Sequence, residues 1–128
     1  MRVCPCDSMM PFQLCCGPLL SGESQAPTAL ALMRSRYTAY AEGAADYLLR
    51  TYAAESRARV DMRATLAGMD GVEWTGLEIV SVRDGQTTHS QGQVEFLAHY
   101  LKAGELLTVH ECSRFVREEG LWRYLDGV

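Results

Sequence analysis

Apolar residues recur at three- and four-residue intervals after Pro27, the spacing of one face of an α-helix. The residues that carry this spacing are Leu30, Met33, Tyr37 and Tyr40. Proline is tolerated in the first turn of a helix, and glycine is a common helix stop. The pattern therefore predicts a helix over 27–42 that begins at Pro27 and ends before Gly43.

The flanking segments are shorter and less regular. Turn-forming residues without periodicity predict a loop over 18–26. Asp46 is expected to open a second helix, one side of which carries Tyr47, Leu48, Thr51 and Tyr52. A third helix is predicted over 62–69, ended by Gly68 or Gly71.

After Gly71 the chain becomes rich in β-branched and aromatic residues, which favour strands. Turn signals at Asp84-Gly85, Ala103-Gly104 and Glu118-Glu119-Gly120 divide this half. The predicted strands are 73–82, 91–101, 105–117 and 121–126. Helices followed by an antiparallel meander are typical of the α+β class, with helices packed on a curved sheet.

Composition and charge limit the functional classes. The 128 residues suit a single domain, and the net charge is −4. Lys102 is the one lysine, and no basic stripe is present, so nucleic-acid binding is not expected as the main role. No apolar run approaches the ~20 residues of a membrane span. Three residues precede the first cysteine, too few for a signal peptide, which predicts a cytoplasmic protein.

Four of the five cysteines, Cys4, Cys6, Cys15 and Cys16, lie within thirteen residues. A segment this short cannot bury a core, so we expect a covalent or coordinate link to hold it. Four thiolates are a common ligand set for structural zinc. Disulfides are rare in reducing compartments, and the usual redox motif spaces its cysteines differently. Zinc is the predicted cofactor; disulfides, redox thiols and scattered free cysteines are the alternatives.

The segment from Cys4 to Gly17, with Phe12 three residues before the vicinal cysteines, resembles the SEC-C zinc knuckle found at the end of the SecA translocation ATPase. Most of the chain is similar to the YchJ-type family of small SEC-C proteins. The stretches that carry this similarity are Leu32-Met-Arg-Ser-Arg-Tyr37, Ala45-Asp-Tyr-Leu-Leu49, Glu73-Trp-Thr-Gly-Leu77, Val94-Glu-Phe-Leu-Ala98, His110-Glu-Cys-Ser-Arg-Phe115 and Trp122-Arg-Tyr-Leu-Asp-Gly127.

The resemblance implies a zinc knuckle over 1–22 and a cystatin-like, nuclear-transport-factor-like cone over 23–128. It also implies a protein partner bound through the knuckle. The sequence departs from the motif after its second cysteine, where Cys-Gly-Ser-Gly is usual: Asp7 and Met9 replace the glycines. Many relatives carry a second knuckle at the C-terminus; the chain stops at Val128, so we expect that knuckle to be absent.

A cone-shaped sheet encloses a pocket, which is the default binding site of such a fold. Alternation along 105–117 predicts that Glu111 faces inward on the same side as Val109, Ser113 and Phe115, whereas His110, Cys112 and Arg114 face outward. Arg34 or Arg36 is the expected partner of Glu111 in a buried ion pair. The aromatic residues Tyr37, Tyr40, Trp74, Trp122 and Tyr124 are predicted to pack in the core and its rim, with cavity lining as the alternative.

Three functional readings follow. The first is a zinc-stabilised module that binds a protein or a small ligand; a homodimer through the sheet is also considered. The second is a small enzyme with Glu111 as the acid–base group, oriented by Arg34, Arg36 or Tyr37. The third is a redox or metal-handling protein whose thiolates release zinc on oxidation. No recognisable catalytic set is present, which favours the first reading.

Overall fold

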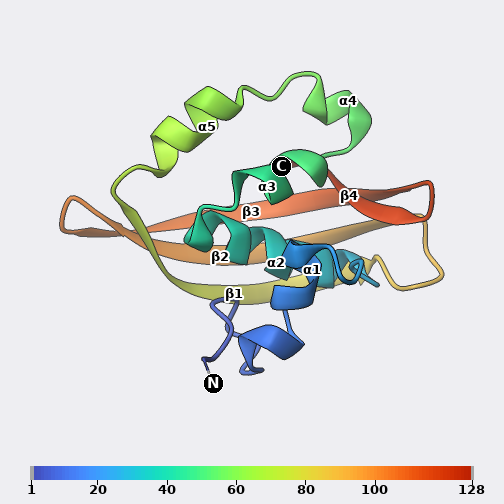
Figure 1. The fold of residues 1–128 in the computed structure, drawn as a ribbon, viewed down its shortest axis with the longest axis horizontal. Coiled ribbons are helices and arrows are strands. Elements are labelled where there is room, and N and C mark those ends of the chain that lie inside the picture. Colours follow the sequence, from blue (N-terminus) through green and yellow to red (C-terminus); the bar gives the residue numbers. More distant parts are fainter. Residues whose placement is uncertain (1, 128) are drawn as a thin grey trace.

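The structure is a computed structural model that describes residues 2–127. One layer is a four-stranded antiparallel sheet in the order β1-β2-β3-β4, and helices α2 and α3 lie across one face of it (Figure 1). The elements are η1 (Phe12–Leu14), α1 (Gly17–Ser21), α2 (Ala29–Glu42), α3 (Ala45–Arg50), α4 (Ala54–Arg57), α5 (Met62–Met69), β1 (Val72–Asp84), β2 (Gln91–Lys102), β3 (Glu105–Glu118) and β4 (Leu121–Gly127). The predicted α+β class with a curved antiparallel sheet is confirmed.

The long helix α2 begins two residues later than predicted. Thr28 is its N-cap, and the Thr28 Oγ1 accepts a hydrogen bond of 3.0 Å from the backbone N–H of Ala31. Pro27 therefore precedes the cap, and its carbonyl accepts a 3.2 Å hydrogen bond from the indole Nε1 of Trp122. Gly43 ends the helix in the left-handed region, at φ 72°, as its position in the sequence predicts.

Two short helices, α1 and α4, were not predicted, and α1 corrects the predicted loop. Residues 18–26 were predicted as a loop, but Pro18 lies in the first turn of α1, which ends at Ser21 with Gly22 as its C-cap. Leu19 and Leu20 of α1 pack against the core, and this burial stabilises a helix too short to be recognised by periodicity. Helix α4, with four residues, is likewise too short to be recognised by periodicity. None of the helices in the described part of the chain is long and apolar enough to cross a membrane.

Two of the predicted turns have the backbone that tight hairpins require. Ala103 and Gly104 have φ values of 52° and 81°, and Glu119 and Gly120 have 51° and 82°. The connection after Asp84 is longer and runs to the start of β2. Register shifts in β1, between Trp74 and Gly76 and between Ile79 and Ser81, are bulges that bend and twist the sheet.

The main core lies between α2 and the inner face of the sheet. Its largest fully buried side chains include those of Trp122, Phe115, Leu32 and Leu48. The free edge of β4 is covered by the segment after α3: the Ala53 N–H donates to the Tyr124 carbonyl over 2.7 Å, and the Tyr124 N–H donates to the Thr51 carbonyl over 2.8 Å. Pairing the edge in this way protects it from association with another strand.

The outer face of the sheet is polar around its two histidines. His110 Nε2 lies 2.6 Å from Glu95 Oε2, and His99 Nε2 lies 2.5 Å from Glu78 Oε2. His110 is exposed, in agreement with the predicted surface position. The homodimer through this face stays a prediction.

Candidate functional site

The four N-terminal cysteines meet in one cluster. Their sulfurs all lie within 4.8 Å of one another; Cys6 and Cys15 are 3.6 Å apart, and Cys15 and Cys16 are 3.9 Å apart. Cys4, Cys6 and Cys16 are at most 2% exposed, whereas Cys15 is partly exposed. One metal ion could be coordinated by all four sulfurs.

Local backbone structure produces this convergence. The Cys4 N–H donates to the Met10 carbonyl over 2.9 Å, and Val3 pairs with Pro11, so the chain between the two halves of the cluster folds back on itself. Cys15 follows the 3₁₀ turn η1 and Cys16 is the N-cap of α1. The turn between two helical segments directs both vicinal sulfurs to the same point.

The thiols influence one another strongly. Hydrogen bonding from Cys16, and then from Ser8 and Cys4, lowers the pKa of Cys6 to about 4 despite its burial. The pKa of Cys16 is raised because its thiol is the donor to Cys6 and because it is buried. Burial is the first cause of the raised pKa of Cys15. Cys6 is thus the cysteine of the cluster that ionises most readily of these three, whereas Cys15 and Cys16 take up a negative charge less readily than a free cysteine does.

Several polar contacts join the segment 2–22, which we call the knuckle, to the rest of the chain, and three of them lie at the cysteine loop. Arg34 of α2 donates from Nη1 to the Cys6 carbonyl over 2.6 Å. The Cys4 sulfur lies 3.7 Å from the Thr38 hydroxyl. Asp7 Oδ2 accepts a 2.9 Å hydrogen bond from the Leu77 N–H in β1. Arg34 was predicted as a pocket residue, but its guanidinium is used here to hold the knuckle.

The two residues that replace the motif glycines keep a glycine-like backbone. Asp7 has φ 61° and Met9 has φ 68°, both in the left-handed region. Asp7 gains its hydrogen bond to β1 there, and aspartate tolerates this region comparatively well. Met9 is 81% exposed and has no comparable compensation. Met9 therefore marks a strained position in the loop.

We expect Met9→Gly to raise the free energy of unfolding by about 1 kcal/mol, because a left-handed non-glycine residue costs roughly 1–2 kcal/mol and glycine loses some of this gain through its unfolded-state entropy. Urea denaturation of the metal-replete protein measures the change. Met10→Gly is the matched control, since Met10 has no positive φ, and it should destabilise. Equal effects of the two variants would contradict the assignment of strain to Met9.

A cavity of about 230 Å³ lies between α2 and the inner face of the sheet. Its walls are mostly aromatic and aliphatic, with two charged side chains. The lining residues are Met33, Arg36, Tyr37, Tyr40, Trp74, Phe96, Ala98, Val109, Glu111, Ser113, Phe115 and Tyr124. The alternation predicted for β3 is confirmed, since its four inward residues all reach this cavity.

The predicted site residues are thus divided. Arg36, Tyr37 and Glu111 meet at the cavity, and Arg34 does not. Of the five aromatic residues predicted to pack in the core and rim, four line the cavity and Trp122 is fully buried away from it. The indole Nε1 of Trp74 is buried and has no hydrogen-bond partner within residues 2–127. A single sequence shows the aromatic content of these walls but not the space between them.

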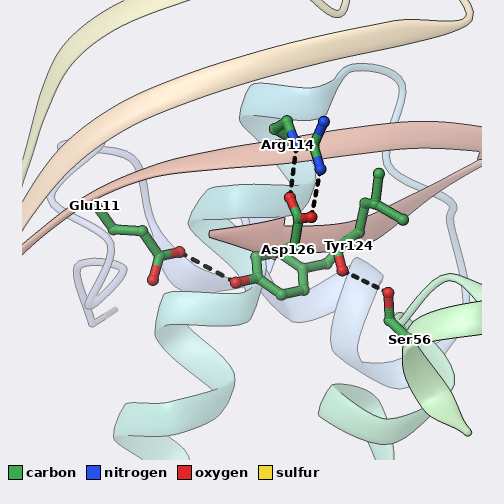
Figure 2. A network of polar contacts seen from close by, with 6 residues as sticks. Ser56, Glu111, Arg114, Tyr124 and Asp126 are labelled. Carbon is green, nitrogen blue, oxygen red and sulfur yellow. Dashed lines mark hydrogen bonds and ion pairs between the residues drawn. The ribbon is translucent and has the colours of Figure 1, made fainter. Parts of the chain in front are cut away.

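Glu111 is bound by neutral donors and not by an arginine. Its Oε2 accepts a hydrogen bond from the Ser113 hydroxyl over 2.5 Å. It also accepts one from the Tyr124 hydroxyl over 3.2 Å (Figure 2). No ion pair involves Glu111 anywhere in the described chain, so the predicted pair with Arg34 or Arg36 is wrong. The register of β3 and β4, which brings Tyr124 opposite Phe115, could have indicated the tyrosine but not its hydrogen bond.

Gly127 makes room for this carboxylate. A Cβ atom at position 127 would lie 2.3 Å from the Glu111 Cδ, so glycine is required for the carboxylate to occupy its place. Two further contacts in Figure 2 fix β4 beside it: Arg114 pairs with Asp126, and the Ser56 hydroxyl donates to the Leu125 carbonyl. Neither contact was predicted from the sequence.

Arg36 is held by the end of α3. It is 5% exposed, and its Nη1 donates to the Leu48 carbonyl over 2.9 Å and to the Thr51 hydroxyl over 2.6 Å. Its Cζ lies 4.4 Å from the centroid of the Tyr52 ring and 4.5 Å from that of Tyr124. These contacts place a buried positive charge at the cavity wall.

The tyrosine hydroxyls at the cavity resist ionisation. Burial is the first cause that raises the pKa of both Tyr37 and Tyr40 to about 12. Burial, and then the negative charge of Glu111, also raise the pKa of Tyr124. At neutral pH these phenols remain protonated and serve as hydrogen-bond donors.

Sequence comparisons identify relatives along nearly the whole chain. A family model described as the YchJ middle NTF2-like domain matches residues 28–127. A UPF0225 protein of Streptomyces coelicolor is 46% identical over 125 residues, covering 97% of this chain and 93% of the relative. The UPF0225 protein YchJ of Shigella dysenteriae is 38% identical, covering 98% of this chain and 82% of the relative.

Two solved structures share the fold. A SEC-C motif containing protein from Rhodopseudomonas palustris, solved in solution, aligns with a TM-score of 0.91 and 34% identity over 99% of this chain and 98% of that one. A crystal structure of a SEC-C motif containing protein from Psychrobacter arcticus aligns with a TM-score of 0.84 and 28% sequence identity, over 98% of this chain and 81% of that one. Together with the cysteine cluster and the curved sheet, these matches show that the chain belongs to the UPF0225 (YchJ) family of SEC-C motif proteins.

Proposed function

We propose that this protein is a zinc-stabilised binding module, in which the four cysteines hold a structural zinc ion and the cavity under α2 binds a small ligand. The observation that carries the proposal is the cavity of about 230 Å³, lined by aromatic side chains and by two opposite charges that do not pair with each other. Apolar pockets with a few polar groups are the usual form of small-molecule sites.

The geometry of the cysteine cluster supports zinc as the metal. Four thiolates at about 2.3 Å from a tetrahedral zinc lie about 3.8 Å from one another. The separations of 3.6 Å for Cys6 and Cys15 and 3.9 Å for Cys15 and Cys16 are close to this value. A site with four protein ligands is closed, and the burial of three of them argues against ready oxidation, so a structural role in the cytoplasm is favoured over redox sensing.

Binding fits the cavity better than catalysis does. General acid–base catalysis is most efficient when the groups that exchange protons have pKa values near the working pH. The pKa values of Tyr37 and Tyr40, raised to about 12, leave both phenols as donors, and Arg36 is permanently charged. Glu111 therefore has no titrating companion among these neighbours. The arrangement is suited to recognising charge and not to transferring protons.

The cavity proposal predicts that small molecules perturb one tryptophan and not the other. The chain has two tryptophans; Trp74 lines the cavity, whereas Trp122 is buried outside it. In amide and indole NMR spectra recorded against a library of small fragments, bound compounds should shift the Trp74 indole signal and leave that of Trp122 in place. Val109→Phe should abolish these shifts, because the larger ring fills the cavity.

Thr108→Phe is the matched control, since Thr108 neighbours Val109 on the same strand but is exposed on the outer face. It should preserve the shifts. The binding function would be rejected if no fragment moved the Trp74 signal, or if the shifts survived in Val109→Phe.

A second candidate function, binding of a protein partner, is favoured by apolar side chains exposed on the knuckle. Met9 is 81% exposed and Leu14 66%, and Val3 and Met10 are also exposed. Exposed apolar groups that gather on one segment commonly mark a protein contact. Because the metal would fix the loop that carries them, we infer that this surface is available only in the metal-bound protein.

A further inference from the structure

The cavity holds two charged side chains with unused bonding capacity. A guanidinium has five N–H donors, and the hydrogen bonds of Arg36 within residues 2–127 all come from Nη1, which leaves Nε and Nη2 without a protein partner. In the same part of the chain, the hydrogen bonds of Glu111 all go to Oε2, so Oε1 remains free to accept.

The two charged side chains contact the same tyrosine but have different hydrogen-bond partners. Arg36 donates to Leu48 and Thr51, and its Cζ lies 4.5 Å from the centroid of the Tyr124 ring. Glu111 accepts hydrogen bonds from Ser113 and from the Tyr124 hydroxyl. Both act on the Tyr40 hydroxyl, where Arg36 lowers the pKa and Glu111 raises it. The charges are therefore close enough to share a neighbour, and yet they form no ion pair.

This arrangement discriminates between ligand charges. A simple organic cation would be attracted by Glu111 but repelled by Arg36. A simple anion would be attracted by Arg36 but repelled by Glu111. A neutral apolar ligand would leave both buried groups without an opposite charge, which is unfavourable. A molecule that carries a carboxylate and an ammonium satisfies both, and charge-assisted hydrogen bonds of this kind are the strong ones.

The rest of the cavity indicates the part of the ligand that carries neither the carboxylate nor the ammonium. Phe96, Phe115 and Met33 form apolar wall, and the tyrosine and tryptophan rings add aromatic surface. The volume of about 230 Å³ lies below the roughly 300 Å³ at which drug-sized pockets begin, which limits the ligand to a small molecule.

We propose that the cavity binds a free amino acid with an apolar or aromatic side chain, its carboxylate on Arg36, its ammonium on Glu111 and its side chain against Phe96 and Phe115. This inference rests on the ligand-binding function proposed above and names the class of ligand.

The test compares three forms of one molecule. L-Leucine, isopentylamine and 4-methylpentanoate share the carbon skeleton, but the second lacks the carboxylate and the third lacks the ammonium. L-Phenylalanine, phenethylamine and 3-phenylpropanoate form a second series. Each is titrated into the metal-bound protein while the Trp74 and Trp122 indole signals are followed. At least one of the amino acids should shift the Trp74 signal and bind about tenfold or more tightly than both of its analogues, because each analogue loses a charge-assisted contact.

The substitution Glu111→Gln removes the negative charge that is proposed to bind the ammonium, with little change in the shape of the side chain. It should weaken binding of the amino acid about tenfold or more. Glu95→Gln is the matched control, because Glu95 contacts His110 on the outer face, and it should leave the affinity unchanged. Equal affinities of the two variants would overturn the assignment of the ammonium to Glu111.

The remaining outcomes separate this inference from the function on which it rests. If an amine or an acid alone bound as tightly as its parent amino acid, the ligand class would be wrong. If none of the six compounds bound but other fragments still shifted the Trp74 signal, the class would again be wrong and the binding function would stand. If no compound of any kind shifted it, both would fail.

Discussion

Replacing Cys15 and Cys16 together by serine is expected to reduce bound zinc from one equivalent per chain to almost none and to disorder residues 1–20, while α2 and the sheet stay folded. A structural zinc contributes roughly 10–16 kcal/mol to small peptide sites at neutral pH. The knuckle has few other means of ordering itself, because its own helical elements η1 and α1 comprise only three and five residues.

Elemental analysis of protein purified without added zinc measures the first effect, and a two-dimensional NMR spectrum measures the second. Cys112→Ser is the control. Cys112 lies in β3, with its sulfur 3.7 Å from Gln93 Oε1, and the variant should retain the metal. A full equivalent of zinc in the double variant would rule out the thiolate site. Loss of the whole spectrum would show that the knuckle and the predicted cone domain, 23–128, are one folding unit.

Arg36→Met should lower the free energy of unfolding by about 3 kcal/mol. The substitution removes two hydrogen bonds from a charged donor, to Leu48 and Thr51, each worth about 1.5–3 kcal/mol. The guanidinium contacts with the Tyr52 and Tyr124 rings are lost as well. Methionine fills most of the space and its packing recovers part of the loss, so the net value is smaller than the sum.

Urea unfolding of the metal-bound variant measures this change. Arg63→Met is the matched control, since Arg63 is exposed on α5 and makes no hydrogen bond or ion pair within the described residues. It should change stability by no more than about 0.5 kcal/mol. If Arg36→Met were as stable as the control, the guanidinium would not be the link between α2 and α3 that its contacts indicate.

Much of the fold could be predicted because its signals are local. The β-branched and aromatic content after Gly71 and the turn residues locate the strands and two of the hairpins, and Gly43 locates the end of α2. The elements that were missed, α1 and α4, have five and four residues and owe their helical form to packing and not to periodicity. Sequence patterns therefore indicate the long elements and leave the short ones to tertiary structure.

The candidate site contains one feature that was predictable from the sequence, the cysteine cluster, and one that was not, the partners of Glu111. The cysteines were predictable because all four lie in one short segment. The pairing of charges was not predictable, because it depends on where two arginines within one turn of α2 point. Arg34 turns toward the knuckle and Arg36 toward the end of α3, so neither reaches Glu111. Alternation in β3 placed Glu111 at the cavity but could not give its partners, which come from β4 and from Ser113 on its own strand.

The hydrogen bond between Asp7 and Leu77 has a consequence for biosynthesis, because its two residues are 70 positions apart. During translation the cysteines leave the ribosome long before β1 exists. The early loop could acquire its ion and contact α2 first, but it can attach to the sheet through Asp7 only after more than half of the chain has been made.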